Sequence, residues 1–443
     1  MVKNITFVFL FVVGLSHGAT FLSITPGARA IGLGQSFAAI ADDASACYYN
    51  PAGLAFINRP QVLAMNLSPP LGIAKGMQWI FAELPYQILG QQERSELDPY
   101  YLADFRLIYW ASAVPLDAKQ SVGISMHYLS LGEVNVRNFD GTYPGTYYPY
   151  DYALSISYGR KITNYISLGI SAKYIYEFFY PRWVLDTLDW TEPGSARSFA
   201  FDGGILFKSP FGFSVGASLL HLGPDIEYDG SSAELPLTGR IGIAQSITDF
   251  ADVISKKNSV LKKVNRWLAF QLTVERKFDL RSEFDYHRTS LGFEAKAFDV
   301  LSYRQGFRLA GERNFLFDEP KSFGLDLGIV ELDITVTNSD WPLGIWWIQS
   351  KFNPLGTKPE FIQNNETLDR IFLNISCLTI PGGGQLYNGD VWKGIPLVVA
   401  SFLIADAILE REARPDWQHK LAAISLPILY LGSTIEANLA ERR

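Results

Sequence analysis

The sequence predicts an all-β protein, a transmembrane antiparallel β-barrel of about 14 strands with an N-terminal plug-like segment in its lumen and a C-terminal α-helical hairpin. Large apolar side chains alternate with small or polar ones along most of the chain, and this period of two is typical of β-strands. Charged residues make up only 19% of the chain and aromatic residues 14%, whereas soluble domains carry about 25% charged residues. The connections between predicted strands alternate between short and long, as they do in outer-membrane barrels.

The alternation is clearest in residues 152–176, where two predicted strands flank a short turn. One phase of the first strand holds large residues and the other small ones, namely Tyr152, Leu154, Ile156 and Tyr158 against Ala153, Ser155, Ser157 and Gly159. A soluble β-sandwich buries the apolar face, whereas a membrane barrel shows it to lipid. One hairpin does not distinguish these folds, but the same chemistry recurs in later strands. The sequence therefore predicts a lipid-facing surface that includes Ile156, Leu168, Val215 and Leu272.

The predicted strands are even in number, which places both ends of the barrel on the periplasmic side. They are residues 29–40, 61–68, 76–84, 104–114, 120–130, 151–160, 164–177, 198–208, 211–220, 238–246, 266–277, 289–298, 301–309 and 322–337. Segment 29–40 has an alternative placement, folded inside the barrel. We expect the short connections in the periplasm, the long ones outside the cell, and residues 248–267 as a basic helix on the periplasmic surface.

The N-terminus has the pattern of a secretory signal peptide. Lys3 precedes the apolar run Ile5–Val13, and small residues follow at positions that a signal peptidase reads. We expect cleavage after residue 18 and export to the outer membrane of a diderm bacterium. The predicted organisation is a signal peptide (1–18), a plug-like segment with the first strand (19–60), the barrel (61–352) and a C-terminal helical extension (353–443).

The C-terminal extension contains a glycine-rich turn motif followed by two apolar segments. The motif residues are Pro381, Gly382, Gly384, Gln385, Tyr387, Trp392, Lys393 and Gly394. Segments 394–409 and 421–435 are both shorter than the ~20 residues that a spanning helix needs. They predict a helical hairpin that packs on the periplasmic rim or lies in the membrane interface. Cys377 precedes the motif, and it either pairs with Cys47 or, as we favour, both cysteines stay free.

The stretch from Pro26 to Leu54 resembles the PorV/PorQ family, which belongs with the FadL-like outer-membrane transport proteins. The residues that carry the resemblance are Gly27, Arg29, Gly32, Gly34, Asp42, Asp43, Ser45, Asn50, Pro51 and Gly53. The resemblance implies a fourteen-stranded barrel whose N-terminal residues fold into or across the lumen. FadL relatives pass hydrophobic molecules through a lateral opening, whereas PorV relatives serve the type IX secretion system and receive cargo proteins.

Several other functions lack the residues that they require. The net charge of −7 gives no basic footprint for nucleic acid, and no histidines are spaced as a metal pair. Gly212–Gly216 matches a nucleophile elbow, but the strand, turn and helix that this motif needs are absent. We therefore predict no catalytic residue, no metal site and no cofactor. His127 falls on the lumen phase and is expected to be solvated.

Charged residues on the predicted lumen phase are expected to form a satisfied network rather than a substrate site. They include Lys173, Asp202, Glu275, Glu294, Lys296, Arg304, Arg308 and Asp326. Buried charges are costly unless they are paired, so a network of ion pairs is the simpler interpretation.

Two functions remain open from the sequence, and both place the barrel in outer-membrane lipid. The first is a docking or shuttle component of type IX-like protein secretion, with secreted cargo proteins or periplasmic secretion components as partners. The second is a FadL-like channel for hydrophobic small molecules. An apolar cavity with a gap in the wall favours the channel, whereas a lumen sealed by the N-terminal segment and an exposed apolar rim favour docking.

Overall fold

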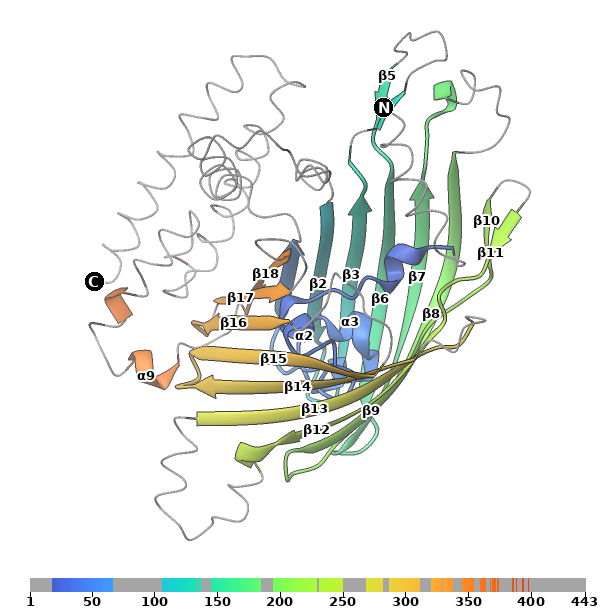
Figure 1. Cartoon of the computed structure of the whole chain (residues 1–443). Coiled ribbons are helices and arrows are strands. Elements are labelled where there is room, and N and C mark those ends of the chain that lie inside the picture. The colour runs from blue at the N-terminus through green and yellow to red at the C-terminus, as the bar shows by residue number, and fades with distance from the viewer. Residues whose placement is uncertain are drawn as a thin grey trace.

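The structure is a computed structural model that describes residues 18–66, 106–132, 134–136, 145–184, 194–228, 231–249, 268–281, 287–310, 320–328, 330–337, 345–353, 359–363 and single positions between 367 and 397. In these ranges, antiparallel strands close into one barrel whose first strand pairs with its last (Figure 1). The barrel strands are β1 (Gln61–Asn66), β2 (Arg106–Pro115), β3 (Gln120–Ser130), β6 (Tyr150–Lys161), β7 (Ile166–Phe178), β8 (Ser195–Lys208), β9 (Phe213–Leu222), β12 (Thr238–Ser246), β13 (Leu268–Asp279), β14 (His287–Ala297), β15 (Leu301–Ala310), β16 (Lys321–Asp326), β17 (Val330–Thr337) and β18 (Ile345–Phe352). Two small hairpins, β4 (Val134–Val136) with β5 (Gly145–Tyr147) and β10 (Ile226–Tyr228) with β11 (Ser231–Ala233), extend two of the long loops.

The two ends of the barrel differ in their connections. Residues 116–119, 162–165, 209–212 and 298–300 make tight turns at one end, which we call the short-turn end. The opposite end, which we call the long-loop end, carries connections such as 131–149, 179–194 and 223–237. The predicted alternation of short and long connections is therefore present in the fold.

The predicted total of fourteen barrel strands is confirmed, but two of the predicted strands are not as expected and one observed strand was not predicted. Residues 29–40 are not a strand. They lie inside the barrel, which is the alternative placement given for them in the sequence analysis. Residues 322–337 form two strands, because a turn in which Leu327 N donates to Val330 O (2.8 Å) divides them. Strand β18 was not predicted, since large residues on both phases, including Trp346 and Trp347, hide its alternation. Predicted strand 76–84 lies outside the described residues.

The outer surface of the barrel is apolar, as predicted. Ile156 is 68% exposed, Leu168 47% and Leu272 41%, and Val215 is partly exposed, whereas Ser157 on the inner phase is 1% exposed. Near the long-loop end, Tyr150, Tyr152 and Tyr176 stack on the same outer face with ring centroids 5.3–6.4 Å apart. An apolar band bordered by aromatic residues is the surface of an outer-membrane barrel embedded in lipid.

We expect Ile156→Arg to destabilise the folded barrel by about 2–4 kcal/mol, because it places a charge at mid-membrane depth on the lipid face. Tyr150→Arg, in the aromatic band near the strand end, should cost only about 0–1 kcal/mol. Urea unfolding of both variants in lipid vesicles measures the difference. Equal costs at the two positions would contradict the assignment of the outer face to lipid.

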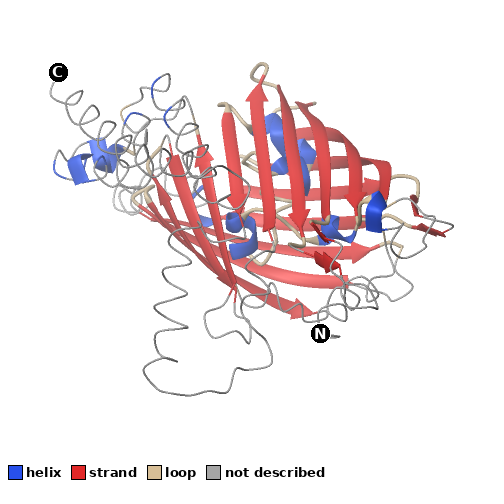
Figure 2. Cartoon of the chain, turned by 90° about the horizontal axis from the view of Figure 1, so that it is seen from above, coloured by secondary structure: helices blue, strands red, loops and turns tan. Residues whose placement is uncertain are grey.

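The N-terminal residues fill the barrel interior, where Figure 2 shows the blue helices inside the ring of red strands. This plug, residues 18–57, contains η1 (Thr20–Ser23), α2 (Ala28–Gly32), α3 (Ala46–Tyr49) and η2 (Pro51–Phe56). Its four helices are short, and glycines and the prolines Pro26 and Pro51, which interrupt regular helices, lie between or beside them. Between them the backbone takes left-handed turns at Gln35 (φ 66°) and Ala41 (φ 35°).

Most of the predicted C-terminal extension lies outside the described residues. A short helix, α9 (Glu360–Gln363), follows the barrel. Of the turn motif, only Gln385, which is buried, and Lys393, which is exposed, are described. The remaining motif residues, Cys377, the helical hairpin, residues 1–17 and most of 248–267 are outside the described ranges. No helix within those ranges is both long and apolar enough to cross a membrane.

Candidate functional site: the plugged lumen

The plug lies directly on the barrel wall because glycines face it from the inner side of the strands. A Cβ atom at Gly169 would come closer than 3.0 Å to the backbone of Ala52, and one at Gly216 would overlap Ala38 in the same way; real Cβ atoms essentially never approach so closely. At every position of this group, a Cβ would come closer than 3.0 Å to a backbone or side-chain atom of the plug. We call the group the glycine belt: Gly123, Gly159, Gly169, Gly204, Gly216, Gly292 and Gly306. Several of these pair directly across strands, which makes the belt continuous over β6, β7 and β8 and again over β14 and β15.

Serine and threonine hydroxyls on the wall bind the carbonyl groups of the plug. Because the plug has little regular structure, its buried carbonyls need partners other than a helix or a sheet. The hydroxyl donors are Ser121 to Ile57 O (3.3 Å), Ser167 to Ala52 O (2.8 Å), Ser218 to Tyr49 O (2.8 Å), Thr273 to Ser36 O (3.2 Å) and Thr335 to Ala28 O (2.6 Å). The small, polar inner face of the strands is therefore a docking surface for the plug.

The Asn50-Pro51-Ala52-Gly53 motif joins two parts of the plug to the wall. Asn50 Oδ1 accepts a hydrogen bond from Ala52 N (3.1 Å) at the start of η2, where Pro51 occupies the first position. Asn50 Nδ2 donates to Ala38 O (2.9 Å) and to Ile205 O (3.1 Å) on β8. A Cβ at Gly53 would overlap the backbone of Ala41, so this turn requires glycine.

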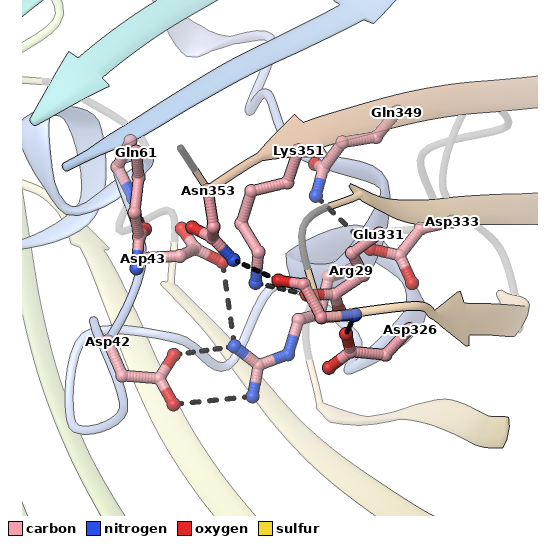
Figure 3. A network of polar contacts seen from close by, with 12 residues as sticks. Arg29, Asp42, Asp43, Gln61, Asp326, Glu331, Asp333, Gln349, Lys351 and Asn353 are labelled. Atoms are coloured by element: carbon pink, nitrogen blue, oxygen red, sulfur yellow. Dashed lines mark hydrogen bonds and ion pairs between the residues drawn. The ribbon is translucent and has the colours of Figure 1, made fainter. Parts of the chain in front are cut away.

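Arg29 holds the plug at the short-turn end of the lumen. Its guanidinium lies 2.5 Å from Asp42 and 3.5 Å from Asp43 (Figure 3). It also lies 3.2 Å from Glu294 on β14. Asp43 in turn accepts from the backbone and hydroxyl of Ser45 at 2.9 and 2.5 Å, which fixes the turn before α3. Arg29 thus joins two loops of the plug to the barrel wall.

The glycines of the predicted motif allow Arg29 to reach this position. Gly27 (φ 92°) and Gly34 (φ 67°) flank α2 with left-handed backbone, which favours glycine. Gly32 faces the wall, where a Cβ would overlap that of Ser322. All ten residues of the N-terminal motif lie inside the barrel, and each has a contact or a backbone angle that accounts for it.

The wall side of this network is built around Arg304 on β15. The Arg304 guanidinium lies 2.5 Å from Glu294, 2.5 Å from Asp333 and 3.6 Å from Glu331. Lys351 pairs with Glu331 in addition. We call this set the clasp: Arg29, Asp42, Asp43, Glu294, Arg304, Glu331, Asp333 and Lys351. The other predicted lumen charges are also paired, since Lys173 lies 2.7 Å from Asp202, Arg240 2.6 Å from Glu275 and Lys296 3.0 Å from Asp326.

His127 is not solvated, so the sequence prediction was wrong for this residue. The plug covers it, and its ring packs edge-on against Phe21, Tyr48 and Tyr109 with centroids 5.6–6.0 Å away. The sequence also did not reveal that His221 faces Asp202, because this contact depends on a bulge. The β8–β9 register shifts beside Asp202. His221 takes φ 65° there, and its backbone N–H donates to the Asp202 carboxylate at 2.8 Å.

Two further motifs weighed in the sequence concern catalysis and metal binding. Gly212 lies in the turn that precedes β9, so the Gly212–Gly216 motif has no helix after it and no nucleophile elbow forms. No group of acidic, histidine or cysteine side chains in the described ranges is arranged to hold a metal ion.

The first residues of the plug are held mainly by apolar packing. Phe21, Leu22 and Ile24 belong to the same buried cluster as Leu129 and Ile175, which lie on the wall near the long-loop end. Hydrogen bonds to this tip, residues 18–26, are few: Gly18 N to Glu234 O (2.9 Å), Ala19 N to the Tyr228 hydroxyl (3.4 Å), and the hydroxyls of Tyr48 and Tyr49 to Leu22 O and Pro26 O (2.7 Å each). The tip occupies an apolar chamber at the long-loop end, whereas the rest of the plug is held by the belt and the clasp.

A small hollow lies in the barrel wall beside the plug. The last described pair of the β15–β16 ladder is Gln305–Lys321, after which Gly306 N donates to Pro320 O (3.0 Å), and residues 311–319 lie outside the described ranges. On the other side of β15, the register with β14 shifts between Thr289 and Ser290. The hollow is lined by Gly34, Gln35, Arg288, Ser290, Phe307, Arg308 and Pro320. Plug residues therefore line it together with Phe307, whose side chain is 42% exposed on the outer surface.

No family model matches the chain, and no curated protein matches its sequence. Among solved structures, the chain is similar to a Pseudomonas aeruginosa FadL homologue (11% identity, TM-score 0.40, covering 74% of this chain and 98% of that one). It is also similar to the Pseudomonas putida toluene transporter TodX (12%, 0.42, 74% and 96%) and to the monoaromatic hydrocarbon channel CymD (12%, 0.41, 74% and 97%). At these scores the likeness carries no argument about function. None of the comparisons supports the PorV/PorQ resemblance or type IX secretion.

Cys47 reports whether the plug is in place. The thiol is fully buried against the wall at Gly123, and burial raises its pKa to about 12. Maleimides react with the thiolate, so in a Cys377→Ser background we expect no labelling of the folded protein up to pH 9. A free cysteine, with a pKa of about 8.5, would be largely ionised at that pH. Labelling should appear on unfolding, as mass spectrometry can show, and rapid labelling of the folded barrel would contradict the docked position of α3.

Proposed function

We propose that this protein is a channel in the outer membrane of a diderm bacterium that admits hydrophobic small molecules past its N-terminal plug. The observation that carries the proposal is the hollow in the wall, which Gly34 and Gln35 of the plug line together with Phe307, a residue exposed on the lipid-facing surface. A molecule with no affinity for water can use such a lateral route, because it never has to leave an apolar environment for the periplasm.

The apolar tip of the plug supports the same function. Phe21, Leu22 and Ile24 fill the chamber at the long-loop end as an apolar ligand would, and few hydrogen bonds hold them there. A hydrophobic molecule that displaces the tip replaces apolar contacts with similar contacts, so the exchange costs little free energy. The clasp and the glycine belt hold the remaining plug in place during the exchange.

The second candidate is a docking component of protein secretion. The observation that favours it is the apolar rim of the short-turn end, where Leu116, Ile162 and Phe211 are half exposed at the tips of turns, together with the filled lumen. Such tips also suit the headgroup region of a membrane, in which apolar and aromatic side chains are common. The rim therefore favours docking less strongly than the hollow beside the plug favours a channel.

Uptake of a neutral aromatic hydrocarbon by cells that produce the protein tests the channel. Ser290→Trp fills the hollow from its lining, and we expect it to reduce the rate of uptake severalfold, toward that of cells without the protein. The matched control is Leu291→Trp, because the adjacent side chain points to lipid and leaves the hollow unchanged. Uptake that is unaffected by Ser290→Trp, or that never exceeds the level of cells without the protein, would contradict the channel.

A further inference from the structure

Two carboxylates face each other on the inner wall near the long-loop end of the barrel. Asp151 on β6 pairs directly with Glu177 on β7, and both lie on the phase of their strands that faces the lumen. Glu177 is only 4% exposed. Like charges on directly opposite strand positions repel each other, and a buried charge is costly unless it is paired. These two residues, which we call the acidic pair, therefore favour a cation beside them.

No lysine or arginine side chain of the described ranges lies at ion-pair distance from the acidic pair. The side chain that contacts Glu177 is the neutral hydroxyl of Tyr228 on β10, which donates to the Glu177 carboxylate at 2.5 Å. Six other carboxylates on the inner wall each lie at ion-pair distance from an arginine or a lysine, namely Asp202, Glu275, Glu294, Asp326, Glu331 and Asp333. The acidic pair differs from them in having no side-chain cation within the described part of the chain.

The backbone nitrogen of Ala19 lies at the acidic pair instead. Ala19 N donates to the Tyr228 hydroxyl at 3.4 Å and also faces the Glu177 carboxylate. Ala19 is 1% exposed, and Leu22 N donates to its carbonyl at 3.0 Å, so η1 holds it in place. The ring of Tyr228 packs against Phe179 with centroids 5.5 Å apart, which fixes the hydroxyl between Ala19 and Glu177. The nitrogen that reaches the acidic pair thus belongs to the first residue after the predicted cleavage position.

We propose that the acidic pair binds the amino terminus of the mature chain, which removal of the signal peptide creates at Ala19. Hydrolysis of the peptide bond between Gly18 and Ala19 by water leaves a carboxylate on Gly18 and an ammonium group on Ala19. The amide nitrogen has one N–H donor and no charge, whereas an ammonium group has three donors and a positive charge. The ammonium group therefore supplies donors for the Tyr228 oxygen and both carboxylates, and its charge offsets their repulsion. Capture of an amino terminus is a recurrent mode of peptide recognition.

The backbone of Ala19 agrees with a chain that begins there. In the uncut chain, Ala19 has left-handed angles of φ 53° and ψ 41°. Such angles are uncommon for a residue with a Cβ, because of close contacts that include the preceding carbonyl oxygen. A terminal residue has no preceding carbonyl, so cleavage removes this restriction while the nitrogen stays in place. The geometry at Ala19 is therefore easier for the mature terminus to adopt than for the uncut chain.

Capture of the terminus makes closure of the plug depend on processing of the chain. A chain cut after residue 18 carries a positive charge at the acidic pair, whereas the uncut chain presents a neutral amide there. Cleavage therefore adds an ion pair at the first residue of the tip. The inference rests on the predicted cleavage position and goes beyond the channel, because it concerns Ala19 and not the passage of a molecule past Phe21, Leu22 and Ile24.

The mature protein, purified from outer membranes into a neutral detergent, tests the proposal in two steps. The first is the mass of its amino-terminal peptide, which we expect to begin at Ala19, and any other first residue would overturn the proposal.

The second step is labelling of the terminal amino group with a succinimidyl ester, which reacts with unprotonated amines. At about pH 8 a free α-amino group, with a pKa of about 7.7–8.0, reacts well before a lysine, with a pKa of about 10.4. Opposite charges nearby favour the protonated form, so the terminus should be labelled at least about tenfold more slowly in the folded barrel than in the urea-unfolded chain. Equal rates in the folded and unfolded protein would contradict capture of the terminus.

Glu177→Gln and Asp151→Asn show whether charge holds the terminus, since each keeps the shape of the side chain and removes its charge. Each should raise the rate of labelling of the folded protein about tenfold. The matched control is Glu227→Gln, which removes an exposed carboxylate from the same hairpin as Tyr228 and should leave the rate unchanged. Retention of the heat-modifiable gel mobility shows that each variant is folded. Unchanged labelling in both folded variants of the acidic pair would overturn the proposal, because apolar packing alone would then protect the terminus.

A lengthened terminus tests the same site without altering the acidic pair. Insertion of a Gly-Ser dipeptide between Gly18 and Ala19 moves the new amino group away by up to about 7 Å of extended chain. This amino group should be labelled at nearly the rate of the unfolded chain. Slow labelling of the lengthened terminus would also overturn the proposal, whereas loss of hydrocarbon uptake alone would count only against the channel.

Discussion

Gly169→Val is expected to release the plug and to open the lumen to ions. The valine Cβ would overlap the backbone of Pro51 and Ala52, which cannot move aside as a flexible side chain could. Even one extra methylene in a packed core costs about 1–3 kcal/mol, and here the overlap is with main-chain atoms that Asn50 and Ser167 hold in place. The wall itself tolerates the change, because β-branched residues suit strands. The variant should therefore fold as a barrel with η2 displaced.

Gly203→Val provides the matched control, since a Cβ at Gly203 meets no atom within 4 Å. Planar-bilayer recordings should show large steady currents for Gly169→Val and few or none for Gly203→Val and the unmodified protein. Cys47 gives an independent measurement, because it should react with maleimide in the folded Gly169→Val barrel only. If Gly169→Val gives no current in the bilayer and its Cys47 does not react with maleimide, the glycine belt does not position the plug.

Arg304→Leu is expected to be the most destabilising single change in the clasp. The Arg304 side chain is 1% exposed and forms ion pairs with Glu294, Glu331 and Asp333 at the same time. Removing one partner of a buried ion pair typically costs about 3–5 kcal/mol, because the other charge stays buried without compensation. Here three carboxylates are affected, so we expect a loss at the upper end of that range in urea unfolding in vesicles.

Lys296→Leu is the comparison for Arg304→Leu. Its pair with Asp326 is only partly buried, with side chains 29% and 20% exposed, and water can solvate the carboxylate that remains. Such pairs contribute little, about 0–1 kcal/mol. If Arg304→Leu is no more destabilising than Lys296→Leu, the carboxylates of the clasp must be hydrated, and the description of the clasp as a buried ion-pair network would be wrong.

The two functions that the sequence left open depend on features that only the assembled barrel has. The plug that fills the lumen, which is associated with docking, and the hollow in the wall, which supports a channel, occur in the same barrel. The hollow lies where Gly34 and Gln35 of the plug meet β14 and β15, and no periodicity in the sequence marks such a contact between distant segments.

The sequence by itself determined the barrel, its lipid-facing surface at Ile156, Leu168 and Leu272, and the order of short and long connections. These features are local, because the alternation of faces follows from the strand backbone and turns depend on a few adjacent residues. The tertiary structure decided what the inner face does. Ser167 meets Ala52, and Arg29 meets Glu294, across 115 and 265 residues, and such contacts depend on closure and register. Only closure of the barrel around the plug turned a face of small and charged residues into the glycine belt and the clasp.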